Sequence, residues 1–194
     1  GLLSELGIVL PTKAATVRRQ AAGALEELPG WANTVVGDLL SELHHLDERI
    51  AQYDKHIQAI ARDDERAKQL MRLSGVGPTT ATALLAMIGN GHEFRCGRQF
   101  AAWLGLTPGQ YSSGGKTRLG RITKAGDAYL RTLLILGARA VLAAAKNKAD
   151  GLSRWATALE QRRGYWKAVV AIAAKNARMC WAMLAKAEQF KLPA

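Results

Sequence analysis

Cysteine is scarce in this chain of 194 residues, and histidine is hardly more common. The two cysteines, Cys96 and Cys180, lie far apart in the sequence, and the four histidines are scattered. A disulfide scaffold or a metal knuckle needs such residues in clusters of short spacing. We therefore predict neither a disulfide framework nor a metal site, and the composition fits a reducing cytoplasm.

A secretory leader and long uninterrupted apolar runs are also lacking. The most apolar C-terminal stretch, residues 168–184, is interrupted by Lys175, Asn176 and Arg178. A membrane-spanning helix needs about 20 predominantly apolar residues. The sequence thus predicts a protein with no membrane span, located in the cytoplasm.

Acidic residues are rare in the second half of the chain. Residues 1–90 hold 9 Lys/Arg and 11 Asp/Glu, whereas residues 91–194 hold 18 Lys/Arg and 5 Asp/Glu. The net charge of +11 therefore comes from the second half alone. Positive charge segregated in this way is typical of a protein with a polyanionic partner. We expect nucleic acid, with a membrane surface as the weaker alternative.

No segment shows the clean alternation of apolar and polar residues that is typical of a half-buried strand. We therefore predict an all-α fold, in which a long coiled-coil helix is followed by a helical domain. A helical arm and coiled-coil connector for dimerisation are placed at residues 1–66. The C-terminal helical domain is placed at residues 67–194.

A stripe of apolar residues at alternating spacings of three and four follows Trp31. It continues for more than three heptads between charged residues, which favours a coiled coil. A helical stretch from Thr12 to Leu28 could cover the stripe equally well as an internal antiparallel partner. Homodimerisation and internal pairing therefore both stay open. The stripe consists of Val36, Leu39, Leu43, Leu46, Ile50, Tyr53, Ile57 and Ile60.

The segment at residues 73–88 resembles a helix-hairpin-helix motif. Its glycines permit a tight turn, Pro78 suits the first turn of a helix, and the unsatisfied N–H groups there attract phosphate. This pattern predicts that Gly75, Gly77 and Thr79 bind a DNA backbone. A plain helix-to-helix turn is the alternative.

The most informative segment is the serine loop, residues 110–126, which places two hydroxyls on a glycine-rich turn ahead of a helix that Asp127 can cap. A serine that attacks a phosphodiester needs neighbours that remove its proton and neutralise the phosphate. Nothing in the loop removes the proton, because Asp127 is its one nearby carboxylate. The residues that we expect at the phosphate are Gly114, Gly115, Lys116, Arg118, Arg121, Lys124 and Arg131.

Aromatic residues make up only 6% of the chain, and several of them lie near its C-terminus. We predict that Trp155, Tyr165, Trp166 and Trp181 pack between helices rather than stack on bases. The cations around them could follow a nucleic-acid backbone, with an affinity that falls steeply with salt.

Together these segments resemble the C-terminal part of bacterial insertion-sequence transposases of the Piv and MooV type, the one-ten family. The resemblance covers the coiled coil, the hairpin at residues 73–85 and the whole segment from residue 95 to about residue 187. Its most specific parts are Leu-Gly-Leu-Thr-Pro at 104–108, Tyr-Ser-Ser-Gly-Gly-Lys at 111–116, Leu-Gly-Arg-Ile-Thr-Lys-Ala-Gly-Asp at 119–127 and Tyr-Leu-Arg at 129–131.

The resemblance implies a recombinase in which Ser112, or Ser113 as runner-up, attacks a DNA phosphate and forms a covalent phosphoserine. Family members also have an N-terminal RuvC-like domain with four metal-binding carboxylates, and an element-encoded bridge or seeker RNA. We expect that domain to be absent from this chain, so these 194 residues should hold no metal and be inactive alone. Mg²⁺ would act in the full-length enzyme, and the basic half would bind RNA as well as DNA.

Two interpretations from different classes remain open. The chain is either the serine-bearing half of a DNA recombinase or a non-catalytic helical module for DNA binding and dimerisation. In the second case Ser112 only hydrogen-bonds phosphate. A hydrolase of small substrates is disfavoured, because no His and carboxylate pair and no nucleophile elbow surround the serines.

Overall fold

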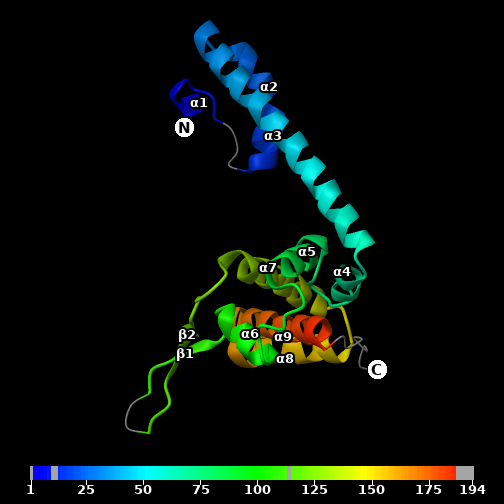
Figure 1. Ribbon diagram of the computed structural model, residues 1–194. Helices are drawn as coiled ribbons and strands as arrows, with labels where there is room; N and C mark the ends of the chain where they lie inside the picture. Colours follow the sequence, from blue (N-terminus) through cyan, green and yellow to red (C-terminus); the bar gives the residue numbers. More distant parts are fainter. Residues whose placement is uncertain (1, 10–12, 113–114, 187–194) are drawn as a thin grey trace. The chain divides into compact units, whose positions relative to one another are not determined.

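Helices account for most of the chain, in agreement with the predicted all-α class (Figure 1). The computed structural model describes residues 2–9, 13–112 and 115–186. The chain divides into two compact units, with the boundary between Lys55 and His56. The helices are α1 (Leu2–Glu5), α2 (Ala14–Ala24), the 3-10 turn η1 (Leu25–Glu27), α3 (Gly30–Asp63), α4 (Glu65–Leu70), α5 (Pro78–Ile88), α6 (Gly97–Trp103), α7 (Ala128–Ala145), α8 (Gly151–Arg163) and α9 (Tyr165–Ala185).

Helix α3 is 34 residues long and carries the predicted heptad stripe. The predicted internal partner of this stripe forms α2 and η1, and Arg18 of α2 pairs with Asp47 of α3 over 2.9 Å. The stripe residues Leu39, Leu46 and Ile50 nevertheless stay exposed. Internal pairing therefore does not bury them, and the prediction of a dimer is neither supported nor opposed by any contact within one chain.

Aspartate side chains cap three helices of the second unit. Asp127 Oδ1 accepts a hydrogen bond from the Leu130 N–H over 2.6 Å at the start of α7, which is the cap that the sequence predicted. Asp64 and Asp150 cap α4 and α8 in the same way. A hydrogen bond from the Arg66 guanidinium lowers the pKa of the Asp64 carboxyl. The starts of these three helices are thus fixed by local side chains.

Helix α9 is the central helix of the second unit and packs against α4, α6, α7 and α8. Its buried face begins at Ala168 and includes Ile172 and Trp181, so the prediction of a packing role is confirmed for Trp181. The same prediction is wrong for Trp166, which is 64% exposed. Trp166 lies in the first turn of α9, ahead of the buried face.

Helices α7 and α9 are each long and apolar enough, by length and composition alone, to cross a membrane. The polar residues that interrupt α9 therefore do not exclude a span on this criterion, contrary to the prediction from the sequence. In the structure both helices bury one face in the core of the second unit, where they pack against each other. A core helix of a globular domain meets the same criterion.

The two cysteines lie in different surroundings. Cys180 is fully buried on α9, and burial raises the pKa of its thiol to about 12. Cys96 is exposed just before α6. Because the thiolate is the reactive form, Cys180 acts as a small apolar core residue.

The turn between α4 and α5 packs against the middle of α7 through two glycines. Gly75 has a φ of +85°, and a Cβ added to it would lie 2.7 Å from the carbonyl oxygen of Gly137. A Cβ added to Gly137 would lie 1.9 Å from the carbonyl oxygen of Gly75. The buried Asn176 of α9 also donates a hydrogen bond to the Ser74 carbonyl over 2.9 Å. The turn is therefore held by α7 and α9 together.

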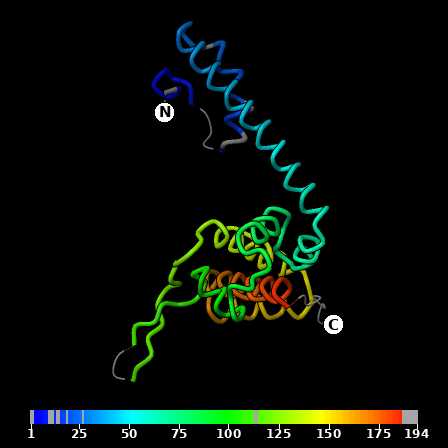
Figure 2. The backbone as a smooth tube through the Cα atoms, viewed as in Figure 1, coloured from blue at the N-terminus to red at the C-terminus, as the bar shows by residue number. Residues whose placement is uncertain are grey.

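The serine loop forms most of an element that the sequence did not predict, a short β-hairpin that begins at Pro108. Strand β1 (Pro108–Gln110) pairs antiparallel with β2 (Leu119–Ile122), and the register is irregular between Pro108 and Gln110. Strands of three and four residues are too short to show alternation in the sequence. Figure 2 shows the two legs of this hairpin running side by side, away from the helices of the second unit.

Candidate nucleic-acid interface

The base of the hairpin is anchored by backbone segments that approach each other closely. A Cβ added to Gly126 would lie 1.8 Å from the carbonyl oxygen of Trp103, and one added to Gly105 would lie 2.4 Å from that of Ala125. Both glycines have positive φ, +72° and +68°. The Lys124 N–H donates to the Gly105 carbonyl over 3.2 Å. Only glycine permits this approach, so these positions fix where the hairpin leaves the helical domain.

Arg131 completes this anchor from the first turns of α7. Its Nη1 donates to the carbonyl oxygens of Leu104 (3.0 Å), Ala125 (3.1 Å) and Asp127 (3.4 Å). The guanidinium thereby joins the end of α6, the end of the serine loop and the start of α7. The predicted contact of Arg131 with phosphate stays a prediction, whereas its positioning role follows from these bonds.

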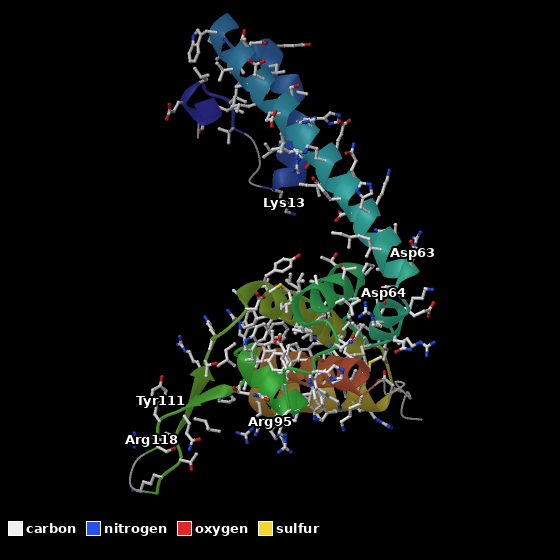
Figure 3. All side chains as sticks on the ribbon, viewed as in Figure 1. Lys13, Asp63, Asp64, Arg95, Tyr111 and Arg118 are labelled. Atoms are coloured by element: carbon white, nitrogen blue, oxygen red, sulfur yellow. The ribbon has the colours of Figure 1, made fainter. Side chains whose placement is uncertain are left out.

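Ser112 is exposed and lies beyond the end of β1. It shares a pocket of about 460 Å³ with Tyr111, Lys116 and Arg118. The Tyr111 N–H donates to the Arg118 carbonyl over 2.8 Å and so joins the two legs of the hairpin, on which Figure 3 labels both residues. A serine hydroxyl and two cations therefore line one pocket.

Gln110 is a residue of this pocket region that the sequence analysis missed. Its Nε2 donates a hydrogen bond to Ser112 Oγ over 2.8 Å. The sequence contains one signal for it, because residues two apart in an extended segment lie on the same side. An amide donor orients the hydroxyl and leaves the hydroxyl proton free, but it cannot accept that proton.

The predicted phosphate-binding residues of the serine loop are solvent-facing. Gly115 is exposed and has a φ of +75°, which glycine adopts readily. Ser113 and Gly114 lie outside the described residues. The side chains of four predicted cations are exposed, namely Lys116, Arg118, Arg121 and Lys124.

The segment before α5, where we predicted a contact with phosphate, forms a turn between two helices. Gly77 is the N-cap residue of α5, no side chain caps it, and Pro78 follows at the first helical position. Thr79 is half-buried in that first turn. Gly75 is needed for packing against α7, which accounts for this glycine without a ligand. Contact of Gly75, Gly77 and Thr79 with DNA stays a prediction.

Groups of three or more His, Cys, Asp or Glu side chains that could hold a metal ion do not occur among the described residues. Asp127, the carboxylate closest in sequence to the serines, is engaged as the cap of α7. The described residues therefore do not form the carboxylate cluster that the family resemblance implies for Mg²⁺. The described partner of Ser112 Oγ is an amide, which does not act as a general base.

Comparisons with known proteins agree on one family. Residues 67–153, which include the hairpin and α7, match the model described as Transposase IS116/IS110/IS902 family. A probable family 20 transposase of Pseudomonas aeruginosa is 46% identical over 195 residues, covering 96% of this chain and 56% of that protein.

Two further relatives show the same coverage. The transposase for insertion sequence element IS1111A of Coxiella burnetii is 40% identical over 98% of this chain and 54% of that protein. The transposase for insertion sequence element IS1328 of Yersinia enterocolitica is 32% identical over 97% of this chain and 57% of that protein. The chain therefore spans about half the length of the curated relatives it matches.

Proposed function

Because the chain belongs to the IS116/IS110/IS902 transposase family, we propose that it binds DNA and supplies the serine nucleophile for strand cleavage and exchange. The observation that carries this proposal is the pocket that Ser112 shares with Lys116 and Arg118 on an exposed hairpin. A phosphodiester in that pocket would have cations beside its oxygens and a hydroxyl beside its phosphorus.

The reaction would proceed by attack of Ser112 Oγ on the phosphorus. A bond from Oγ to phosphorus forms as the bond to one deoxyribose oxygen breaks, which leaves a covalent phosphoserine on one strand end. The released oxygen takes up a proton from solvent and becomes the hydroxyl of the other strand end. Lys116 and Arg118 stabilise the charge that develops on the phosphoryl oxygens. Gln110 positions Oγ through its hydrogen bond. The base that takes the hydroxyl proton would come from outside the described residues.

RNA is a second proposed ligand of the same basic surface. The exposed cations of the hairpin and of α8 and α9 can bind phosphates, which DNA and RNA share. These side chains have no hydrogen-bond acceptors that would select particular bases, so they suit either nucleic-acid backbone. A guide RNA of the element would bind here beside the DNA.

The DNA-binding part of the proposal is tested by neutralising the hairpin. In Lys116→Gln/Arg118→Gln/Arg121→Gln we expect the affinity for duplex DNA to fall at least about tenfold. We also expect the slope of log affinity against log salt to fall by about 0.9 for each phosphate that the protein no longer neutralises. Fluorescence anisotropy over a salt series measures both quantities.

A matched control removes the same charge from α3, where Arg49, Lys55 and Arg62 are equally exposed. Arg49→Gln/Lys55→Gln/Arg62→Gln should retain most of the affinity. If the two triple variants bind DNA equally weakly, net charge and not the hairpin accounts for binding, and the proposed interface is wrong.

Dimerisation through α3 is proposed from its uncovered stripe. Leu46 and Ile50 are 43% and 58% exposed in the single chain, where apolar side chains of a coiled coil would be buried against a second copy. In Leu46→Asp/Ile50→Asp we expect a monomer at concentrations where the parent chain is a dimer. Light scattering coupled to gel filtration gives the mass.

The control for the stripe is Gln52→Asp/Gln58→Asp, which adds the same charge to exposed positions of α3 outside the stripe. It should keep the mass of the parent chain. A parent chain that is monomeric at all concentrations, or a stripe variant that stays dimeric, would contradict the proposal.

A further inference from the structure

An exposed aromatic pair lies where α8 ends and α9 begins. Gly164 separates the two helices with a φ of +84°, and Tyr165 and Trp166 follow it directly. Trp166 is 64% exposed and Tyr165 is 37% exposed. Neither ring belongs to the proposed serine site. Exposure alone does not identify a binding surface, so the surroundings of the two rings decide whether they can hold a ligand.

The two rings are held in a fixed arrangement by a residue of α7. Their centroids lie 5.2 Å apart with an interplanar angle of 78°. Arg139 places its guanidinium carbon 5.9 Å from the centroid of the Trp166 ring, and its Nε donates to the Tyr165 hydroxyl over 3.3 Å. These contacts restrict the rotamers of both rings, which lowers the conformational entropy that is lost when a flat ligand binds.

Cations flank the aromatic pair in the sequence. Arg162 and Arg163 precede it at the end of α8, and Lys167 follows it in the first turn of α9, all with exposed side chains. Arg139 contacts both rings, and these three cations lie within four residues of them in the sequence. This combination of aromatic faces and cations is complementary to the bases and the phosphates of a nucleic-acid strand.

We propose that this aromatic–basic platform, formed by Arg139, Arg162, Arg163, Tyr165, Trp166 and Lys167, binds unpaired single-stranded DNA. A base stacks on the Trp166 indole, and the cations bind the adjoining phosphates. A duplex engages only the cations, because its bases are stacked on each other and present no free face. The choice of DNA over RNA rests on the proposed function, since strand cleavage and exchange expose unpaired DNA.

The test uses the 194-residue chain and fluorescein-labelled oligo-dT, with a blunt DNA duplex and oligo-U of equal length as comparison probes. Trp166→Ala should weaken oligo-dT binding about tenfold, as expected for the loss of one stacked base. Its affinity for the duplex should change less than about twofold, since phosphate contacts remain. Trp166→Phe keeps a stacking face and should retain most of the oligo-dT affinity.

Trp31 provides a matched control, because it is also 64% exposed and lies on α3. Trp31→Ala should bind every probe as the parent chain does. Equal melting temperatures of both alanine variants and the parent show that an exposed ring was removed without unfolding.

Three outcomes would overturn the proposal: an unchanged oligo-dT affinity in Trp166→Ala, an equal loss on the duplex, or a Trp166-dependent preference for oligo-U over oligo-dT. None of these results bears on Ser112, because the assay involves no strand cleavage. Conversely, a failure of the serine chemistry would leave a Trp166-dependent affinity for oligo-dT intact.

Discussion

Ser112→Ala is expected to abolish covalent protein–DNA adducts while leaving duplex binding within about twofold of the parent. Loss of a nucleophile removes the covalent step itself, so the rate of adduct formation should fall on the order of 10⁴-fold or more. The exposed hydroxyl makes no described contact except with Gln110, so the hairpin should keep its structure. The assay incubates labelled insertion-sequence ends with a protein of the full length of the relatives that includes this chain. Denaturing gel electrophoresis then separates the covalent adducts.

Thr117→Ala is the matched control, since Thr117 is an exposed hydroxyl residue of the same loop. It should form adducts at nearly the parent rate. Adducts that persist in Ser112→Ala and vanish in Ser113→Ala would make Ser113 the nucleophile. Adducts that persist in both variants would favour the other interpretation, a non-catalytic DNA-binding and dimerisation module.

Gly137→Ala is expected to destabilise the helical domain severely, although alanine is the better helix former. Helix propensity alone predicts a gain of about 1 kcal/mol for this change on α7. The new Cβ would lie 1.9 Å from the carbonyl oxygen of Gly75, a backbone atom in a turn that α7 and α9 hold in place. We expect a net loss of roughly 3 kcal/mol in the free energy of unfolding, which is the upper range for overpacked cores.

Urea denaturation followed by circular dichroism measures this loss. The control is Gly151→Ala at the first residue of α8, where an added Cβ meets no atom within 4 Å. Its unfolding free energy should change by no more than about 0.5 kcal/mol. If Gly137→Ala is as stable as Gly151→Ala, the close contact between the turn and α7 does not exist in solution.

The features that sequence analysis predicted correctly are those with local causes. The cap by Asp127 depends on residues three apart, and the length of α3 follows from a repeating apolar pattern. The family resemblance likewise rested on contiguous motifs, which lie mostly within the matched residues 67–153.

The features that it missed depend on contacts between distant residues. Arg131 donates to a carbonyl oxygen 27 residues away, a contact that no local pattern predicts. From its position after the serines alone, it was predicted to bind phosphate. The packing of Gly75 on Gly137 joins a turn to a helix more than 60 positions away in the sequence, and no local pattern predicts that contact. The exposure of Trp166 depends on where the buried face of α9 begins. The serine loop was identified from the sequence, whereas its hairpin pairing and the contact with Gln110 required the structure.

Helix α7 sets a distance between the two predicted phosphate-binding elements. It begins at Ala128, next to the hairpin anchor, and meets the turn before α5 at Gly137. At 1.5 Å per residue these points are about 14 Å apart along the helix axis. Since base pairs of DNA repeat every 3.4 Å or so, this interval equals roughly four base pairs. If both elements bind one duplex, they would do so from anchor points that α7 holds at a fixed separation.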